Sequence, residues 1–189
     1  KNKDYFSVGT FYKKSSNFIE LVTDLYGRLT WNNAEKSYVA GIELEGRKVI
    51  VKNLDLIGNV TLTQSQSQTK ANGTHPMYGQ APYIINGILS YNWEKIKLTT
   101  TLSYNVQGRR LSIVSYPGTT IPNIYEMPRN MFDFKVMKKL GNHFLVSFTV
   151  RDILNTAIRR VYLYSDGTKI DYDRYRYGTS YVISLAYKL

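Results

Sequence analysis

The sequence predicts an all-β protein built from about eight antiparallel, up-and-down strands. Three observations carry this prediction. Apolar and polar residues alternate with a period of two through most of the chain, which places one kind on each face of a strand. Tyrosine supplies 17 of the 189 residues and proline only 5, a balance that suits strands at a boundary between water and an apolar phase. The connections between the strands alternate between short and long.

The first half of the chain contains four predicted strands, with the approximate ranges 4–14, 28–48, 54–66 and 83–93. The first can continue through 18–22 beyond an irregular segment, Ser15-Ser16-Asn17. We expect the second to be broken by a turn or bulge near Asn32-Asn33 and again near Gly41, because asparagine and glycine favour such breaks.

The second half contains four more predicted strands, with the approximate ranges 95–107, 130–139, 144–150 and 178–189. Alternation is clearest in 95–107 and also holds in the last strand, which has its apolar residues on one face. Its apolar positions are Tyr181, Ile183, Leu185, Tyr187 and Leu189. The total of about eight is even, as single-chain barrels of the outer membrane require.

The connections and the aromatic residues favour a membrane wall over a soluble sandwich. The segments 49–53, 92–94 and 140–142 are short, whereas 67–82, 115–128 and 152–177 are long; membrane barrels have short periplasmic turns and long outer loops. Aromatic residues collect near strand ends, where interfacial girdles lie: Tyr12, Tyr91, Trp93, Tyr104, Tyr181 and Tyr187. No run reaches the roughly 18 apolar residues of a membrane helix. We therefore expect the short turns, Lys1 and the C-terminus on the periplasmic side.

Five sequence pieces carry a family resemblance. In order they are Tyr-Val-Ala-Gly-Ile-Glu-Leu-Glu at 38–45, Gly-Gln-Ala-Pro-Tyr-Ile-Ile-Asn at 79–86, Tyr-Asn-Val-Gln-Gly-Arg-Arg at 104–110, Tyr-Glu-Met-Pro-Arg at 125–129 and Val-Arg-Asp-Ile-Leu-Asn at 150–155. Each piece alone is weak, but the five in this order are specific. The chain resembles the C-terminal part of the barrel of TonB-dependent outer-membrane receptors. It departs from that family at Leu189, where phenylalanine is usual.

The resemblance implies a 22-stranded barrel with an N-terminal plug and an energy-coupling box, of which residues 1–189 would be the C-terminal portion of the barrel without the plug. It implies active import of a nutrient such as a siderophore, an oligosaccharide or a peptide, and no enzymatic activity or cofactor. The implied partners are outer-membrane lipid, the remaining strands and plug of the same receptor, TonB through the N-terminal part, and a transported ligand that the sequence does not identify.

Two other interpretations stay open. One is a self-contained eight-stranded barrel with a structural or adhesive role; the other is a soluble β domain that binds polyanions. The predicted inward side chains disfavour the small barrel, because charges are costly in its narrow interior. These are Lys95, Lys97, Lys135, Lys139, Arg47, Arg151 and Lys188 against Glu43, Glu45, Asp55 and Asp133. The net charge of +11 is spread along the chain, so we expect no nucleic-acid partner.

The candidate functional residues lie in the predicted outer loops, where arginine and tyrosine interleave. Such side chains stack on rings and pair with anions. The candidates are Tyr78, Tyr116, Tyr125, Arg159, Arg160, Tyr162, Tyr164, Arg174 and Tyr175, with Arg176 and Tyr177 beside them. A plainer interpretation is that the last loop extends two strands above the membrane and uses these residues for β-propensity and solvation.

Other polar groups suggest little chemistry. Asp166, Asp171 and Asp173 could offer oxygens to calcium, but their spacing does not match an EF-hand loop. We expect His75 and His143 to be solvated, and no catalytic constellation is present in the sequence.

Overall fold

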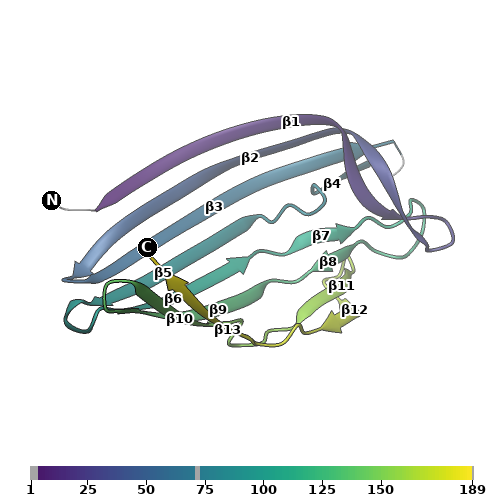
Figure 1. Cartoon of the computed structure of the whole chain (residues 1–189). Coiled ribbons are helices and arrows are strands. Elements are labelled where there is room, and N and C mark those ends of the chain that lie inside the picture. The colour runs from purple at the N-terminus through teal and green to yellow at the C-terminus, as the bar shows by residue number, and fades with distance from the viewer. Residues whose placement is uncertain (1–3, 71–72, 189) are drawn as a thin grey trace.

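One long antiparallel sheet dominates the computed structural model, which describes residues 4–70 and 73–188. Its order is β1-β2-β3-β5-β6-β9-β10-β13, with β4 paired to β3 (Figure 1). The strands are β1 (Tyr5–Thr23), β2 (Leu29–Val51), β3 (Leu54–Thr69), β4 (Gly73–His75), β5 (Tyr83–Trp93), β6 (Leu98–Gln107), β9 (Arg129–Leu140), β10 (Phe144–Arg151) and β13 (Ser180–Tyr187). Apart from β4, these are the predicted strands in the predicted order. The expectations for Lys1 and Leu189 fall outside the described residues.

A second, smaller sheet is built from two of the predicted long loops and the segment that precedes the first of them. It consists of β7 (Arg110–Ile113), β8 (Ile124–Glu126), β11 (Ile158–Leu163) and β12 (Lys169–Tyr175), in the order β12-β11-β8-β7. It lies at one end of the long sheet, opposite the short turns that join β2 to β3, β5 to β6 and β9 to β10 (Figure 1). The two loops therefore pair with each other in one sheet, whereas the sequence suggested paired strands for the last loop alone.

The register of the long sheet separates an apolar face from a polar face. On the apolar face, each residue of one row is the cross-strand partner of the next, through five strands: Val8, Leu44, Val60, Ile85 and Val106. The apolar face is open: Leu102 is 40%, Phe148 39% and Leu185 69% exposed. These side chains therefore do not form the closed apolar core of a soluble sandwich.

The polar face carries a ladder of asparagines. The amide of Asn86 donates to Asn59 Oδ1 at 2.7 Å, and the amide of Asn105 donates to Asn86 Oδ1 at 2.5 Å. Cross-strand pairs of this kind stabilise neighbouring strands. Arg47 and Asp55 form an ion pair at 3.0 Å on the same face, so this side of the wall suits a hydrated space.

Most of the predicted aromatic residues lie at the borders of the apolar face. Tyr91 and Trp93 meet edge to face at 4.6 Å near the short turns, where Tyr187 also packs against Phe144 at 5.1 Å. Tyr181, the second residue of β13, lies at the other border. Tyr104 instead lies inside β6 and donates to Asn130 Oδ1 at 2.7 Å.

Two expectations about local breaks are wrong. β2 continues through Asn32, Asn33 and Gly41 without interruption, and the irregularity lies in β1, where Asn17 has φ +56° while the strand goes on. Gly41 makes room for the ring of Phe11, its partner across the strand pair, instead of starting a turn.

A third correction concerns the turn between β5 and β6. Lys95 lies in the 3₁₀ turn Glu94–Ile96, and Lys97 follows it with φ +51°. Neither residue therefore belongs to the strand, which starts at Leu98.

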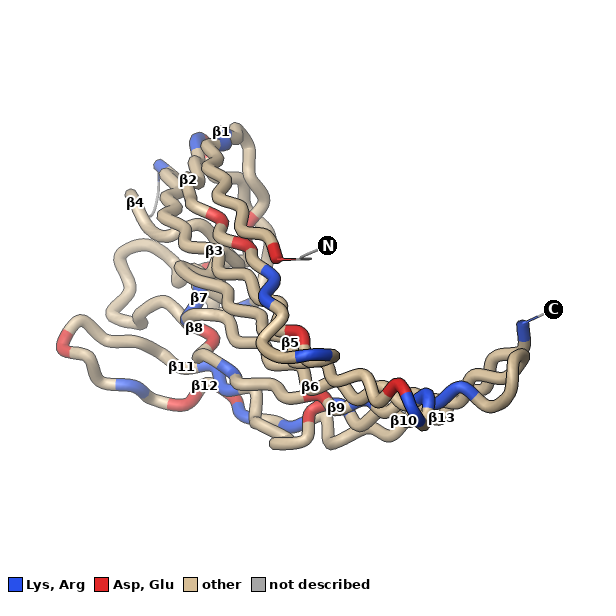
Figure 2. Tube along the Cα trace, turned by 90° about the vertical axis from the view of Figure 1, so that its left-hand side faces the viewer, with Lys and Arg blue, Asp and Glu red and all other residues tan. Residues whose placement is uncertain are grey.

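The long sheet is an open curve and not a closed barrel. Within the described residues, β1 pairs with β2 and β13 pairs with β10 on one side only. Figure 2, seen from the end with the short turns, shows β1 and β13 on the two separate borders of a trough. The structure therefore does not form the self-contained eight-stranded barrel. Among the described residues, no helix is long and apolar enough to cross a membrane.

The packed core lies between β1 and the small sheet, at the end opposite the short turns, which we call the outer end. Figure 1 shows β1 and β2 bending at this end to reach β7. Val22 pairs with Val114 in a parallel bridge, and the Thr23 amide donates to the Val114 carbonyl at 2.9 Å. The buried apolar side chains here are Val22, Leu111, Ile113, Val114, Ile124 and Val161. Buried apolar side chains are thus concentrated beneath the loops, whereas the apolar side chains of the long sheet are largely exposed.

Candidate ligand-binding face at the outer end

Six of the nine predicted site residues lie on or at the end of one hairpin, β11–β12. Two of its arginines pair with acidic residues of the opposite strand. Arg160 binds both carboxylate oxygens of Asp173, and Arg159 binds Asp171 at 2.6 Å. The plainer interpretation of this loop as paired strands is correct, although the strands belong to a sheet of their own.

These ion pairs also engage the acidic residues considered for calcium. Asp171 and Asp173 are held by arginines, and Asp166 accepts hydrogen bonds from the amide and hydroxyl of Thr168 at 2.8 and 2.9 Å. Those bonds lower the pKa of Asp166. Among the described residues, no three His, Cys, Asp or Glu side chains gather as a metal site would require.

The hairpin presents aromatic rings beside its charges. Tyr162 meets Tyr172 edge to face at 5.6 Å, and the Arg160 guanidinium lies 5.3 Å from the Tyr172 ring centre. Burial raises the pKa of Tyr162, so its hydroxyl is a neutral donor at physiological pH. Tyr164 and Arg174 are exposed at the surface of the hairpin.

The other three predicted residues are separate from the hairpin surface. Tyr125 of β8 is half-buried and packs on the cluster of Val22, Leu111 and Val114, so its role is at least partly structural. Tyr116 is exposed in the β7–β8 loop, and its amide donates to Thr23 Oγ1 at 2.9 Å. Tyr78 meets Trp31 edge to face at 6.3 Å.

A polar cleft of about 260 Å³ lies where the small sheet meets the polar face of the wall. We call it the outer cleft. It is lined by Asn105, Gln107, Gly108, Arg110, Glu126, Met127, Arg129, Met131, Ile158, Tyr175 and Tyr177. Only Tyr175 among the nine predicted residues belongs to this set. Its ring meets Tyr177 edge to face at 5.4 Å, and the hydrogen bond with Tyr177 raises its pKa.

Two ion pairs hold the walls of the outer cleft. Arg110 binds Glu126 at 2.8 Å and the Gln107 side chain at 3.0 Å. Arg129 binds Asp152 at 2.5 Å, and both side chains are nearly buried. The two pairs join three of the sequence pieces, 104–110, 125–129 and 150–155. These three pieces were noted for the family resemblance and not for a cleft, because the interleaved arginines and tyrosines directed the prediction to the hairpin.

A buried acid–base pair was missed by the sequence reasoning, and the expectation that His75 is solvated is wrong. Glu20 is fully buried, and its Oε1 lies 3.5 Å from His75 Nε2, whose side chain is 5% exposed. Burial lowers the pKa of His75, but the nearby Glu20 carboxylate and the hydrogen bond with the Pro76 carbonyl outweigh it, so the pKa is raised. The bend of β1 over the core encloses this pair. His143, by contrast, is exposed as expected.

Comparisons with known proteins agree with this architecture. The family model described as outer membrane protein beta-barrel family matches residues 1–187. The ferric-catecholate import receptor Fiu from E. coli superposes with a TM-score of 0.63 at 13% identity, over 98% of this chain and 25% of that receptor. A variant of the ferric enterobactin receptor PfeA from Pseudomonas aeruginosa, in complex with enterobactin, gives 0.67 at 16% identity, over 97% and 29%. No curated protein sequence matches the chain.

Proposed function

We propose, from the premise that this chain belongs to the outer membrane protein beta-barrel family, that it forms the C-terminal part of the barrel of a TonB-dependent importer. In this proposal the apolar face contacts outer-membrane lipid and the polar face lines a wide hydrated lumen. The short turns face the periplasm. The remaining strands, the plug and the contact with TonB belong to other parts of the same receptor.

The observation that carries this proposal is the match between shape and length. The chain spans about a quarter of the receptors that it superposes on, and its sheet curves without closing (Figure 2). A wall segment of a larger barrel has both properties. Open edges in lipid cost several kcal/mol per unpaired backbone group, so the edges of β1 and β13 require neighbouring strands.

The ligand of the proposed importer meets this segment at the outer cleft and the β11–β12 hairpin. Tyr175 and Tyr177 offer aromatic surface, while Arg110 and Arg129 supply cations that are already oriented by acidic partners. This combination suits a nutrient with flat rings or sugar rings and acidic or hydroxyl groups, a class that includes siderophores and oligosaccharides.

The test is energised uptake in cells that lack the gene and in cells that carry it on a plasmid. The nutrients offered are labelled ferric siderophores, oligosaccharides and peptides. We expect one of them to accumulate above its external concentration only when the gene, the proton-motive force and TonB are all present. Equilibration that is unaffected by loss of TonB would instead identify a passive barrel.

A further inference from the structure

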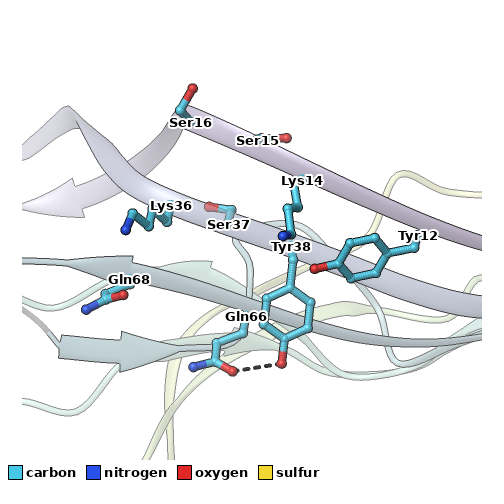
Figure 3. A pocket seen from close by; sticks show the side chains of 9 residues that line it. All are labelled: Tyr12, Lys14, Ser15, Ser16, Lys36, Ser37, Tyr38, Gln66 and Gln68. Carbon is cyan, nitrogen blue, oxygen red and sulfur yellow. Dashed lines mark hydrogen bonds between the residues drawn. The ribbon is translucent and has the colours of Figure 1, made fainter.

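A pocket lies on the outward-facing side of the wall, at the border where its apolar face ends. It measures about 560 Å³ and is lined by Tyr12, Lys14, Ser15, Ser16, Lys36, Ser37, Tyr38, Gln66 and Gln68 (Figure 3). The outer cleft lies on the opposite face of the sheet, so this pocket is a separate site.

The strand register fixes the direction in which this pocket faces. Tyr12 follows Val8 by four residues on β1, Tyr38 precedes Ile42 by four on β2, and Gln66 follows Leu62 by four on β3. Residues separated by an even number along a regular strand share a face. The Tyr12, Tyr38 and Gln66 side chains therefore continue the apolar, lipid-facing row.

The distance from the short turns places the pocket at the second membrane border. From Ile50, beside the β2–β3 turn, to Tyr38 the strand is about 40 Å long, or about 28 Å along the membrane normal at a tilt of about 45°. The apolar band of an outer-membrane barrel is about 25 Å tall. Tyr12 and Tyr38, whose rings lie 6.2 Å apart, thus occupy the outer aromatic girdle, and Lys14 and Lys36 come directly above it.

The pocket gathers positive charge and hydrogen-bond donors at that height. The Lys14 ammonium lies 5.6 Å from the Tyr12 ring centre. Tyr38 donates to Gln66 Oε1 at 2.8 Å, which leaves the amide N–H groups of Gln66 as donors (Figure 3). The described lining residues include no carboxylate.

The nearest acid along β2 is engaged elsewhere. Glu35, next to Lys36 in the chain, pairs with Lys70 at 3.3 Å. Lys14 and Lys36 are exposed, so their charges are available to an anion at the membrane surface. Basic pockets at headgroup level bind anionic lipid headgroups.

We propose that this pocket binds the phosphate-bearing headgroup of a lipid of the outer leaflet, with Lys14 and Lys36 pairing with phosphate and Gln66 and Gln68 donating to its polar sugar or ester oxygens. The site holds the barrel at a fixed depth and tethers one lipid to the wall. This inference uses the orientation given under Proposed function, with the short turns toward the periplasm, but it does not depend on transport.

The test measures lipid binding to the complete natural protein in detergent micelles by native mass spectrometry and titration. The probes are lipopolysaccharide, the same lipid after enzymatic removal of its phosphates, and inorganic phosphate. The variant is Lys14→Gln with Lys36→Gln, and the matched control is Lys52→Gln with Lys95→Gln, which removes two lysines from the short turns. A Lys14→Arg, Lys36→Arg protein keeps both charges.

We expect the Lys14, Lys36 glutamine variant to bind the phosphorylated lipid about 30-fold more weakly, since each surface charge contributes about a factor of five. The control and the arginine protein should bind within threefold of the natural protein, and the dephosphorylated lipid should bind poorly to all. The proposal would be overturned if the glutamine variant bound the phosphorylated lipid as tightly as the natural protein does. It would also be overturned if the natural protein bound the dephosphorylated lipid as tightly as the phosphorylated one. Binding of inorganic phosphate without binding of either lipid would show an anion site and contradict a lipid site. A loss confined to the Lys52, Lys95 variant would show instead that the orientation is inverted, while energised uptake could still be present.

Discussion

The ring of Phe11 occupies the space above Gly41, its cross-strand partner between β1 and β2. A Cβ atom added at Gly41 would lie 2.5 Å from Phe11 Cζ and 2.6 Å from the Leu62 carbonyl oxygen. The lack of a side chain at this position therefore lets three strands approach while an aromatic ring covers the exposed backbone.

Replacement of this glycine should destabilise the wall. We predict that Gly41→Ala lowers the free energy of unfolding by about 1–3 kcal/mol, because the new methyl group overpacks the site. Addition of Phe11→Ala should restore only part of the loss, since the Leu62 carbonyl stays in place. Urea unfolding in detergent micelles measures both changes. Gly87→Ala is the control, because a Cβ there meets nothing within 4 Å; equal losses for Gly41 and Gly87 would contradict the packing account.

The Arg129–Asp152 pair should be a strong anchor of the outer loops. Asp152 has φ +52°, its amide donates to Asp133 Oδ1 at 2.8 Å, and its carbonyl accepts from Thr179 Oγ1 at 2.9 Å. We predict that Asp152→Ala costs about 3 kcal/mol, since it leaves a nearly buried guanidinium without its partner. Asp152→Asn should cost less because asparagine tolerates a positive φ.

The comparison pair for this experiment is Arg47–Asp55, which has the same chemistry but is about 28% exposed. Asp55→Ala should cost about 1 kcal/mol or less, as more exposed pairs do. Chemical unfolding of the two alanine variants under identical conditions checks the order, and a larger loss at Asp55 would be inconsistent with it.

The Glu20–His75 pair should make the local stability of β4 depend on pH. The pKa of His75 is raised above its usual value of about 6.5, so the folded state binds the proton more tightly than the unfolded state. The resulting stabilisation is fully present below about pH 6.5 and is lost as the pH rises through the raised pKa. Hydrogen exchange of Gly73–His75, corrected for intrinsic rates, should show a lower free energy of opening at pH 9 than at pH 6. The His75→Gln protein should lose this difference; if it keeps the full difference, another group is responsible.

The two arginine environments of the β11–β12 hairpin should respond differently to mutation. Arg160 holds both oxygens of Asp173 and contacts Tyr172, whereas Arg174 is exposed on the opposite strand. We predict that Arg160→Ala lowers the local stability of the hairpin by about 1–2 kcal/mol and that Arg174→Ala leaves it unchanged. Limited proteolysis and hydrogen exchange of residues 158–175 measure this difference. Equal protection of the two variants from cleavage and exchange would contradict the stabilisation of the hairpin by the Arg160–Asp173 ion pair.

The long strands were predictable because each position of a membrane wall meets either lipid or water. Because of that contrast, apolar and polar residues alternate along strands such as β6 and β13. Gly41 was misread since the same residue serves a turn and a close ring contact, and only the register with Phe11 distinguishes them.

The outer end was harder to predict, because its folding depends on contacts between distant segments. Val22 and Val114 meet although 92 residues separate them, and Glu20 is buried by the same bend. Arg129 and Asp152 belong to two separate sequence pieces of the family resemblance, and neither piece indicates that the two residues form an ion pair. The plainer interpretation of the last loop as paired strands was correct, whereas a role of its arginines and tyrosines in ligand binding is still a proposal.

The apolar face of the long sheet, which includes Leu102, is proposed to contact lipid, and the polar face, which includes Ser103, to contact water. The chain has no cysteine, so Leu102→Cys and Ser103→Cys each introduce one labelling site within it. Any cysteine elsewhere in the complete protein is first replaced by serine, and the protein carrying one fluorophore is reconstituted into vesicles. Quenching by brominated lipid tails and by aqueous iodide then reports the surroundings of each label. The account predicts tail quenching at position 102 and not at 103, with iodide quenching stronger at 103. Equal tail quenching at both positions, or stronger tail quenching at 103, would contradict it.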